Sequence, residues 1–166
     1  MVKIMLDSSS DSKNHHPYDY YIPLTVDIGG RCYKDGIDLR PQRFYKLLAT
    51  AADFPKTSQP SPDDFLQAFE EVKANGDELI YMTVSSALSG TYQSAHIAKS
   101  MVDYDGIYIV DSGAASHLIG LLARHADKLR QEGFTAGEIV GVGVKQMAYA
   151  AKLGDLGDFL LVVRHF

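Results

Sequence analysis

The chain has 166 residues, of which 46% are aliphatic or aromatic and 22% are charged, a composition typical of a soluble globular domain with a substantial core. Its formal net charge of -5, with no more than two basic neighbours grouped anywhere, excludes a surface built to bind nucleic acid or another polyanion. The single cysteine, Cys32, excludes an intrachain disulfide and fits a reducing cytoplasm.

The chain begins with the apolar run "VKIMLDSS" (2–9), which predicts a short buried strand that ends in a polar cluster. The sequence turns polar after six residues, too early for the apolar core of a signal peptide. Further along, no apolar run approaches the ~20 residues that a membrane span needs. We therefore expect a cytoplasmic protein without a membrane span.

Extended chain is predicted over residues 20–36, with a turn at Gly29 and Gly30. The next segment, 41–53, places three apolar side chains on one helical face, those of Phe44, Leu47 and Leu48. A helix is therefore expected there.

The segment "KTSQPSP" (56–62) predicts a loop that leads into a second helix. Ser61 is a good N-cap for that helix, Asp64 stands at the spacing of a capping box, and Gly76 predicts its end. The run "ELIYMTV" (78–84) follows and predicts a buried strand.

The remaining elements continue this alternation of helix and strand. A helix is expected over 91–102, a strand over 106–112 and a long helix from about 114 to 131. Thr135 and Glu138 stand at capping-box spacing and open one further helix.

The predicted strands are apolar throughout instead of alternating between apolar and polar residues. This pattern predicts one α/β domain whose parallel β-sheet has helices on both faces. Since the carboxyl ends of parallel strands share one edge, we expect three polar clusters to meet there: Asp7 to Ser10, Ser85 with Ser86, and Asp111 with Ser112. Whether segment 56–62 approaches that edge or the opposite one stays open.

The segment "SSALSGTYQSA" (85–95) places hydroxyl groups and a glycine where a strand ends and a helix begins. Gly90 would let the backbone approach a ligand closely, and a carboxylate or phosphate would receive backbone N–H groups and the Ser89 hydroxyl. The alternative is that Ser89 or Ser86 only caps the helix. No Walker loop or G-x-G-x-x-G motif occurs, so we expect no nucleotide and no other cofactor.

Three motifs, "KTSQPSP", "SSALSGTYQSA" and "DSGAAS", follow an N-terminal "DSSSD" in this order, and together they resemble the DegV family over residues 1 to about 140. The resemblance implies the α/β fold of that family's N-terminal domain and the binding of a long-chain fatty acid. Some members are the lipid-carrying subunit of bacterial fatty acid kinase. The resemblance therefore implies a non-catalytic chain that presents the lipid carboxylate to a partner kinase.

The same resemblance implies which residues hold the carboxylate. They are the Thr of T-S-Q-P and the Ser-Gly of L-S-G-T, here Thr57, Ser89 and Gly90. Ser58 and Gln59 are weaker candidates, for which the alternative is that they only shape the loop. The acyl chain needs an apolar enclosure, in which each buried methylene contributes ~0.8 kcal/mol. Six apolar residues could form its walls, but an ordinary core between helix and sheet is favoured for each of them, so none is assigned to the ligand: Leu88, Ile97, Leu118, Ile119, Leu121 and Leu122.

A small serine hydrolase or transferase is the alternative from another class, with Ser89 or Ser86 as nucleophile. Such chemistry needs a base within hydrogen-bond reach of the serine, whereas His96 lies about two turns along the helix. A third possibility is a domain that binds no ligand. No spacing of His, Cys and Asp matches a known metal site, so no metal is expected.

The resemblance fails towards the C-terminus. DegV proteins usually have a second α/β domain that closes over the lipid and adds a basic or imidazole group, whereas residues 141–166 are a tail atypical of the family. The lid domain is therefore expected to be absent or truncated, with Arg164 and His165 as weak candidates for the missing cation. A domain without its lid exposes a large apolar face, so a homodimer that covers this face is a hypothesis.

Overall fold

The computed structural model of the chain describes residues 1–10 and 18–144. Its centre is a sheet of four parallel strands in the order β2-β1-β6-β7. These strands are β1 (Val2–Asp7), β2 (Tyr20–Ile22), β6 (Glu78–Thr83) and β7 (Ile107–Asp111). The parallel sheet predicted from the apolar strands is confirmed.

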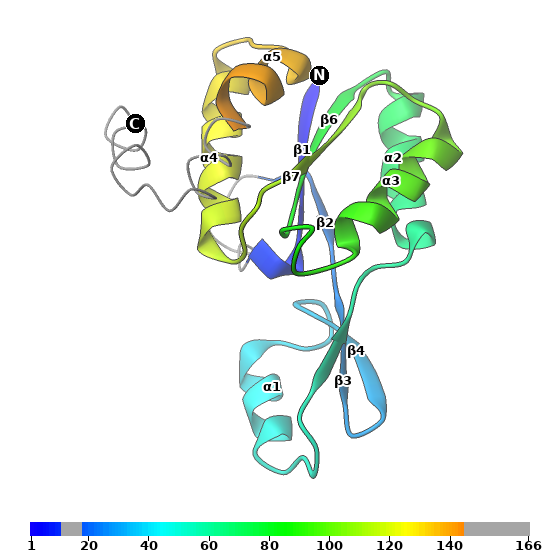
Figure 1. Cartoon of the computed structure of the whole chain (residues 1–166), viewed down its shortest axis with the longest axis vertical. Helices are drawn as coiled ribbons and strands as arrows, with labels where there is room; N and C mark the ends of the chain where they lie inside the picture. Colours follow the sequence, from blue (N-terminus) through cyan, green and yellow to red (C-terminus); the bar gives the residue numbers. More distant parts are fainter. Residues whose placement is uncertain (11–17, 145–166) are drawn as a thin grey trace.

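Helices cover both faces of this sheet (Figure 1). One face carries α2 (Pro62–Ala74) and α3 (Thr91–Val102); the other carries α4 (His117–Gln131), α5 (Ala136–Glu138) and a π-helical turn, η2 (Ile139–Val144). Successive strand residues point to opposite faces, so Ile80 packs beneath α4 whereas Tyr81 packs beneath α2 and α3. Because both faces are buried, the strands are apolar at successive positions.

A second, smaller sheet lies beyond the carboxyl edge of the first (Figure 1). It is antiparallel, with the order β4-β3-β5, and consists of β3 (Thr25–Ile28), β4 (Arg31–Lys34) and β5 (Lys56–Ser58). The helix α1 (Pro41–Leu48) packs against it. We call these four elements, residues 25–58, the small lobe.

Glycine at the tip of the small lobe makes its hairpin possible. Gly29 and Gly30 have φ angles of 61° and 80° and form the two-residue connection between β3 and β4, in which Ile28 lies opposite Arg31. Both central residues of such a turn need positive φ, a region that favours glycine. The turn predicted at these two residues is confirmed.

Part of the segment predicted as a loop over 56–62 is a strand. Its first three residues form β5, in which Thr57 lies opposite Val26 of β3. The edge of β3 offers unpaired backbone groups, and pairing with β5 satisfies them. The capping box after this strand is as predicted, because the Ser61 amide donates to the Asp64 carboxylate at 2.8 Å.

Two helices are shorter than predicted. The long helix expected from 114 begins at His117, since Gly113 and Ser116 have φ angles of 63° and 61°, which a right-handed helix cannot contain. The helix expected over 41–53 ends at Leu48, after which the amides of Thr50 and Ala51 donate to carbonyls three residues back and close the helix.

The C-terminal tail falls mostly outside the described residues. Residues 145–166, with Arg164 and His165, belong to this part of the chain. The described residues 141–144 complete η2. Across residues 1–10 and 18–144, no helix combines the length and the apolar character needed to cross a bilayer.

We expect Phe65→Ala to lower the free energy of unfolding by about 3–5 kcal/mol, because truncation of a buried aromatic leaves a cavity. Phe65 is fully buried, and its ring centroid lies 5.5 Å from that of Tyr81 and 5.7 Å from that of Phe69. Urea denaturation measures the change. The matched control is Phe54→Ala, at a side chain that is 91% exposed. Equal losses in the two variants would contradict the assigned core.

Candidate functional site

The polar residues at and after the ends of β1, β6 and β7 meet at the carboxyl edge of the parallel sheet. The hydroxyl of Tyr81 donates to Asp7 Oδ2 at 2.9 Å, which joins β6 to the end of β1. The hydroxyl of Ser86 donates to Asp111 Oδ2 at 2.6 Å, which joins the β6–α3 loop to the end of β7. The edge is therefore a hydrogen-bonded platform, as the strand order predicts.

Asp111 holds the loop between β6 and α3. Its carboxylate accepts from the Ser86 amide at 3.1 Å and from the Gly113 amide at 2.9 Å, in addition to the Ser86 hydroxyl. Carboxylates that accept several such bonds bind a loop strongly, since hydrogen bonds to a charged group are stronger than neutral ones. The hydroxyl of Ser86 is therefore occupied by a structural contact.

Ser89 and Gly90 stand at the start of α3. Gly90 occupies the N-cap position, with φ −77° and ψ 5°, and makes no side-chain cap. Ser89 Oγ lies 2.8 Å from Thr91 Oγ1 and accepts from the Thr91 amide at 3.3 Å. Ser89, one residue before the N-cap, thus accepts a hydrogen bond from one amide of the first turn. Ser86 does not cap the helix, because its hydroxyl bonds to Asp111.

The small lobe brings Thr57 and Ser58 to the same edge. Both residues lie on β5 and are exposed to solvent. The next residue, Gln59, donates from Nε2 to Ser94 Oγ at 3.0 Å, in the first turn of α3. Segment 56–62 therefore approaches the carboxyl edge, which answers the question left open by the sequence, and the two motifs lie side by side.

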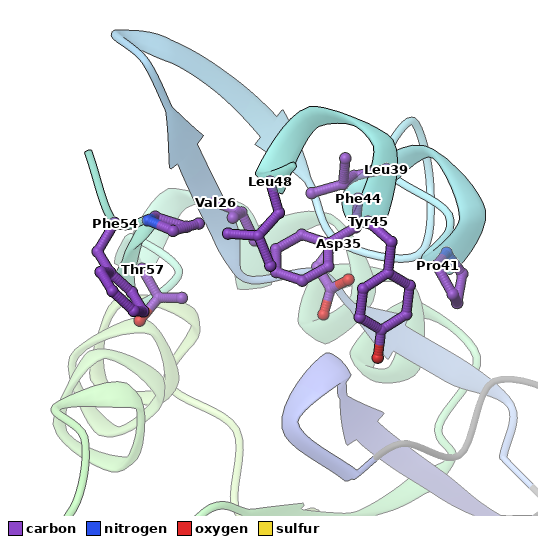
Figure 2. Close-up of a pocket in the computed structure, with 10 residues that line it drawn as sticks. Val26, Asp35, Leu39, Pro41, Phe44, Tyr45, Leu48, Phe54 and Thr57 are labelled. Atoms are coloured by element: carbon purple, nitrogen blue, oxygen red, sulfur yellow. The ribbon is translucent and has the colours of Figure 1, made fainter. Parts of the chain in front are cut away.

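A cavity of about 450 Å³ opens in the small lobe between α1 and the strands β3 and β5 (Figure 2). Figure 2 shows Phe54 and Thr57 at one end of this cavity, and Pro41 and Tyr45 at the other. The volume is within the range of small-molecule sites, about 300–1,000 Å³. Its lining is mostly apolar and consists of Val26, Asp35, Leu39, Pro41, Phe44, Tyr45, Leu48, Phe54, Pro55 and Thr57.

None of the six apolar residues considered as walls lines this cavity, and for two of them, Ile119 and Leu122, the structure shows the ordinary core that the sequence favoured. Ile119 and Leu122 are fully buried between α4 and the sheet, whereas Leu88 is 70% exposed and Ile97 is 52% exposed. The lining comes from several segments that meet only in the folded lobe. In the sequence, one feature indicated part of this lining, namely the apolar face predicted for the segment that forms α1.

Neither Ser86 nor Ser89 has the surroundings of a catalytic nucleophile. Within residues 1–10 and 18–144, neither hydroxyl contacts a histidine: Ser86 bonds to Asp111, and Ser89 pairs with Thr91. In the same part of the chain, no group of three or more His, Cys, Asp and Glu residues is placed to hold a metal ion. The arrangement suits the binding of an anion better than nucleophilic catalysis.

Asp7 is a fully buried carboxyl group at this edge. Burial raises its pKa above 3.8, and hydrogen bonds from Ser9, Tyr81 and Val84 offset only part of that rise. Burial, with the nearby Asp7 carboxylate, also raises the pKa of the Tyr81 hydroxyl well above 10.0. Tyr81 therefore stays neutral and serves as a donor to Asp7.

Comparison with known sequences points to one family. A family model described as an uncharacterised protein of the DegV family matches residues 1–149. A DegV domain-containing protein of Caldanaerobacter subterraneus subsp. tengcongensis is 39% identical over 142 residues, which are 84% of this chain and 50% of that protein. The chain spans about half the length of the curated relatives that it matches.

Solved structures share the fold. A Thermotoga maritima protein, described as revealing fatty acid binding function, has a TM-score of 0.77 and 36% identity, and the match covers 90% of this chain and 56% of that one. The Streptococcus pneumoniae fatty acid kinase B3 protein, loaded with linoleic acid, has a TM-score of 0.75 and 25% identity, with 90% and 54% covered. The expected α/β fold is confirmed.

We expect Asp7→Asn to gain stability relative to the wild type as pH rises. The folded-state pKa of Asp7 is raised, so the wild type alone loses stability as this buried group ionises. The difference in free energy of unfolding, variant minus wild type, should be smallest below pH 3.8 and increase by up to about 1.4 kcal/mol per pH unit until the folded pKa is passed.

Urea denaturation at a series of pH values measures this difference. Asp53→Asn, at an exposed carboxylate in the segment before β5, is the control for the loss of one charge. A difference that decreases as pH rises would contradict the raised pKa.

Proposed function

Because the chain belongs to the DegV family, we propose that it binds a long-chain fatty acid and catalyses no reaction on it. Membership rests on the match over residues 1–149. The observation that carries the proposal is the apolar cavity that ends at Thr57, beside the loop of Ser89 and Gly90. An apolar cavity next to hydroxyl groups and a helix start suits a ligand with a long tail and one anionic end.

The carboxylate of the fatty acid lies, in this proposal, between β5 and the start of α3. It accepts from the hydroxyls of Thr57 and Ser89 and from the Gly90 amide, with Ser58 as a weaker donor. When the Thr91 hydroxyl donates in its pair with Ser89, the Ser89 proton is free for the ligand. The N-terminus of α3 adds partial positive charge behind the loop.

The acyl chain extends from Thr57 into the cavity of the small lobe. Each buried methylene contributes ~0.8 kcal/mol, so the tail supplies most of the affinity. The carboxylate of Asp35 also lines the cavity, on the side of Tyr45 and away from Thr57 (Figure 2). Repulsion between like charges disfavours a reversed ligand, whose acid group would lie beside Asp35.

Presentation of the lipid to a partner fatty acid kinase is the finer part of the proposal. Ser86 is exposed and Leu88 is 70% exposed beside the carboxylate position, which leaves access for a second protein. One neighbour in fold is described as a fatty acid kinase B3 protein. Phosphoryl transfer from ATP then belongs to the partner and not to this chain.

The alternatives have less support. A serine hydrolase needs a base on its nucleophile, and the contacts of Ser86 and Ser89 provide none among the described residues. A domain without any ligand is the remaining alternative, and native mass spectrometry of the purified protein tests it through the mass of a retained fatty acid. The homodimer considered from the sequence stays a prediction.

We expect the double variant Thr57→Ala with Ser89→Ala to weaken fatty-acid binding by about 2–5 kcal/mol, because two hydrogen bonds to a charged group are lost. Displacement of a fluorescent fatty acid by oleic acid measures the affinity. The matched control is Thr50→Ala with Ser100→Ala, since both of these residues are exposed and their hydroxyls bond to the backbone carbonyl three residues back. Unchanged affinity in the first double variant would refute the carboxylate site.

We expect Leu48→Trp to weaken the binding of long acyl chains more than that of short ones. Leu48 lines the cavity and is half-buried, so a larger side chain fills space that the tail would occupy. The loss should grow by ~0.8 kcal/mol for each displaced methylene. The same displacement assay with octanoic and oleic acids measures it, and equal losses for both would place the tail elsewhere.

A further inference from the structure

The side chain of Gln59 lies directly on Gly90. A Cβ atom added to Gly90 would clash with Gln59 Oε1 and would lie 2.8 Å from both Cδ and Nε2 of the same side chain. Carbon atoms normally approach no closer than about 3.5 Å. The missing Cβ of residue 90 is therefore what allows the Gln59 amide to rest on the start of α3.

Conformation does not explain this glycine. Gly90 has φ −77° and ψ 5°, a backbone geometry that residues with side chains also adopt. Gly29 and Gly30 differ, because their positive φ angles favour glycine while an added Cβ would meet nothing within 4 Å. At position 90 the requirement is space, and the space is filled by Gln59.

The same side chain makes a specific bond to α3. Gln59 Nε2 donates to Ser94 Oγ at 3.0 Å, and Ser94 is 4% exposed, within the first turn of the helix. The Ser94 amide in turn donates to the Gly90 carbonyl at 3.0 Å. Gln59 thus contacts both ends of the first turn, one residue after β5 ends.

From this geometry we propose that Gln59 is a positioning residue, which latches β5 to α3 and so sets the spacing between the hydroxyls of Thr57 and Ser89. Gly90 serves the site by making room for this latch. The inference rests on the proposed function for its role in lipid binding, but the latch itself is independent of any ligand.

The contacts of Gln59 matter because few other interactions fix the position of β5. It is an edge strand of three exposed residues, paired on one side only, with β3. The ion pair between Lys34 and Asp64, at 3.2 Å, links the lobe to α2, but it is partly exposed and such pairs contribute little. Ordering two donors before the ligand arrives lowers the entropic cost of binding.

The test is a double-variant cycle on Gln59 and Gly90. Gly90→Ala displaces the Gln59 side chain, whose far end is flexible, and Gln59→Ala removes it. Each single variant should raise amide hydrogen exchange over residues 56–58 and weaken oleic acid binding by about threefold to tenfold, the range of one neutral hydrogen bond. The double variant should be no worse than either single one, because both changes release the same latch.

Additive losses in the double variant would overturn the proposal, since the missing Cβ of Gly90 would then have an effect that does not pass through Gln59. Unchanged exchange over 56–58 in Gln59→Ala would overturn it as well. Gln42→Ala, at an exposed glutamine on α1, and Gly141→Ala, where an added Cβ meets nothing within 4 Å, are the matched controls.

Gln59→Glu separates the latch from the ligand. A glutamate can still accept from the Ser94 hydroxyl, so exchange over 56–58 should stay close to that of the wild type. Its charge lies beside the carboxylate position, so oleic acid affinity at pH 7 should fall below that of Gln59→Ala. If the wild type binds no oleic acid, the proposed function fails, whereas the exchange measurements still decide for or against the latch.

Discussion

Burial of the parallel sheet on both faces is the constraint from which the rest of the molecule follows. Ile80 and Tyr81, neighbours on β6, are both fully buried, one beneath each layer of helices. Polar groups inside such a sheet would lose their hydration, so they gather where the strands end. Asp7 lies at the end of β1: it is buried, and hydrogen bonds from Ser9, Tyr81 and Val84 compensate for part of the lost hydration.

The candidate site combines residues of the parallel sheet with residues of the small lobe, and the sheet is more tightly packed than the lobe. The parallel sheet supplies the loop of Ser89 and Gly90, which the Asp111 carboxylate holds through Ser86. The small lobe has a core of only a few buried side chains, and its helix α1 contains no buried residue. Its cavity lies between α1 and the strands β3 and β5. An acyl chain in this space would complete the apolar packing of the lobe, which is a physical reason for placing the tail there.

Several features could be predicted because they depend on local pattern. The apolar runs gave the strands, capping residues such as Ser61 marked helix starts, and Gly29 with Gly30 marked the hairpin. The meeting of three polar clusters followed from parallel strand direction alone. Ser89 and Gly90 entered as site candidates through their place between a strand and a helix, whereas Thr57 and Ser58 entered through the resemblance to the DegV family. The strand β5 and the cavity were missed, since both depend on how distant segments pack.

By itself, the sequence determined the α/β class, the family and the polar edge of the sheet, because periodicity and motifs are properties of neighbouring residues. Only the tertiary structure decided that segment 56–62 reaches the carboxyl edge, that the cavity lies beneath α1, and that Gly90 makes room for Gln59. Each of these is a contact between segments far apart in the chain or on different elements. Their distances are set by packing of the whole domain, and no local pattern encodes them.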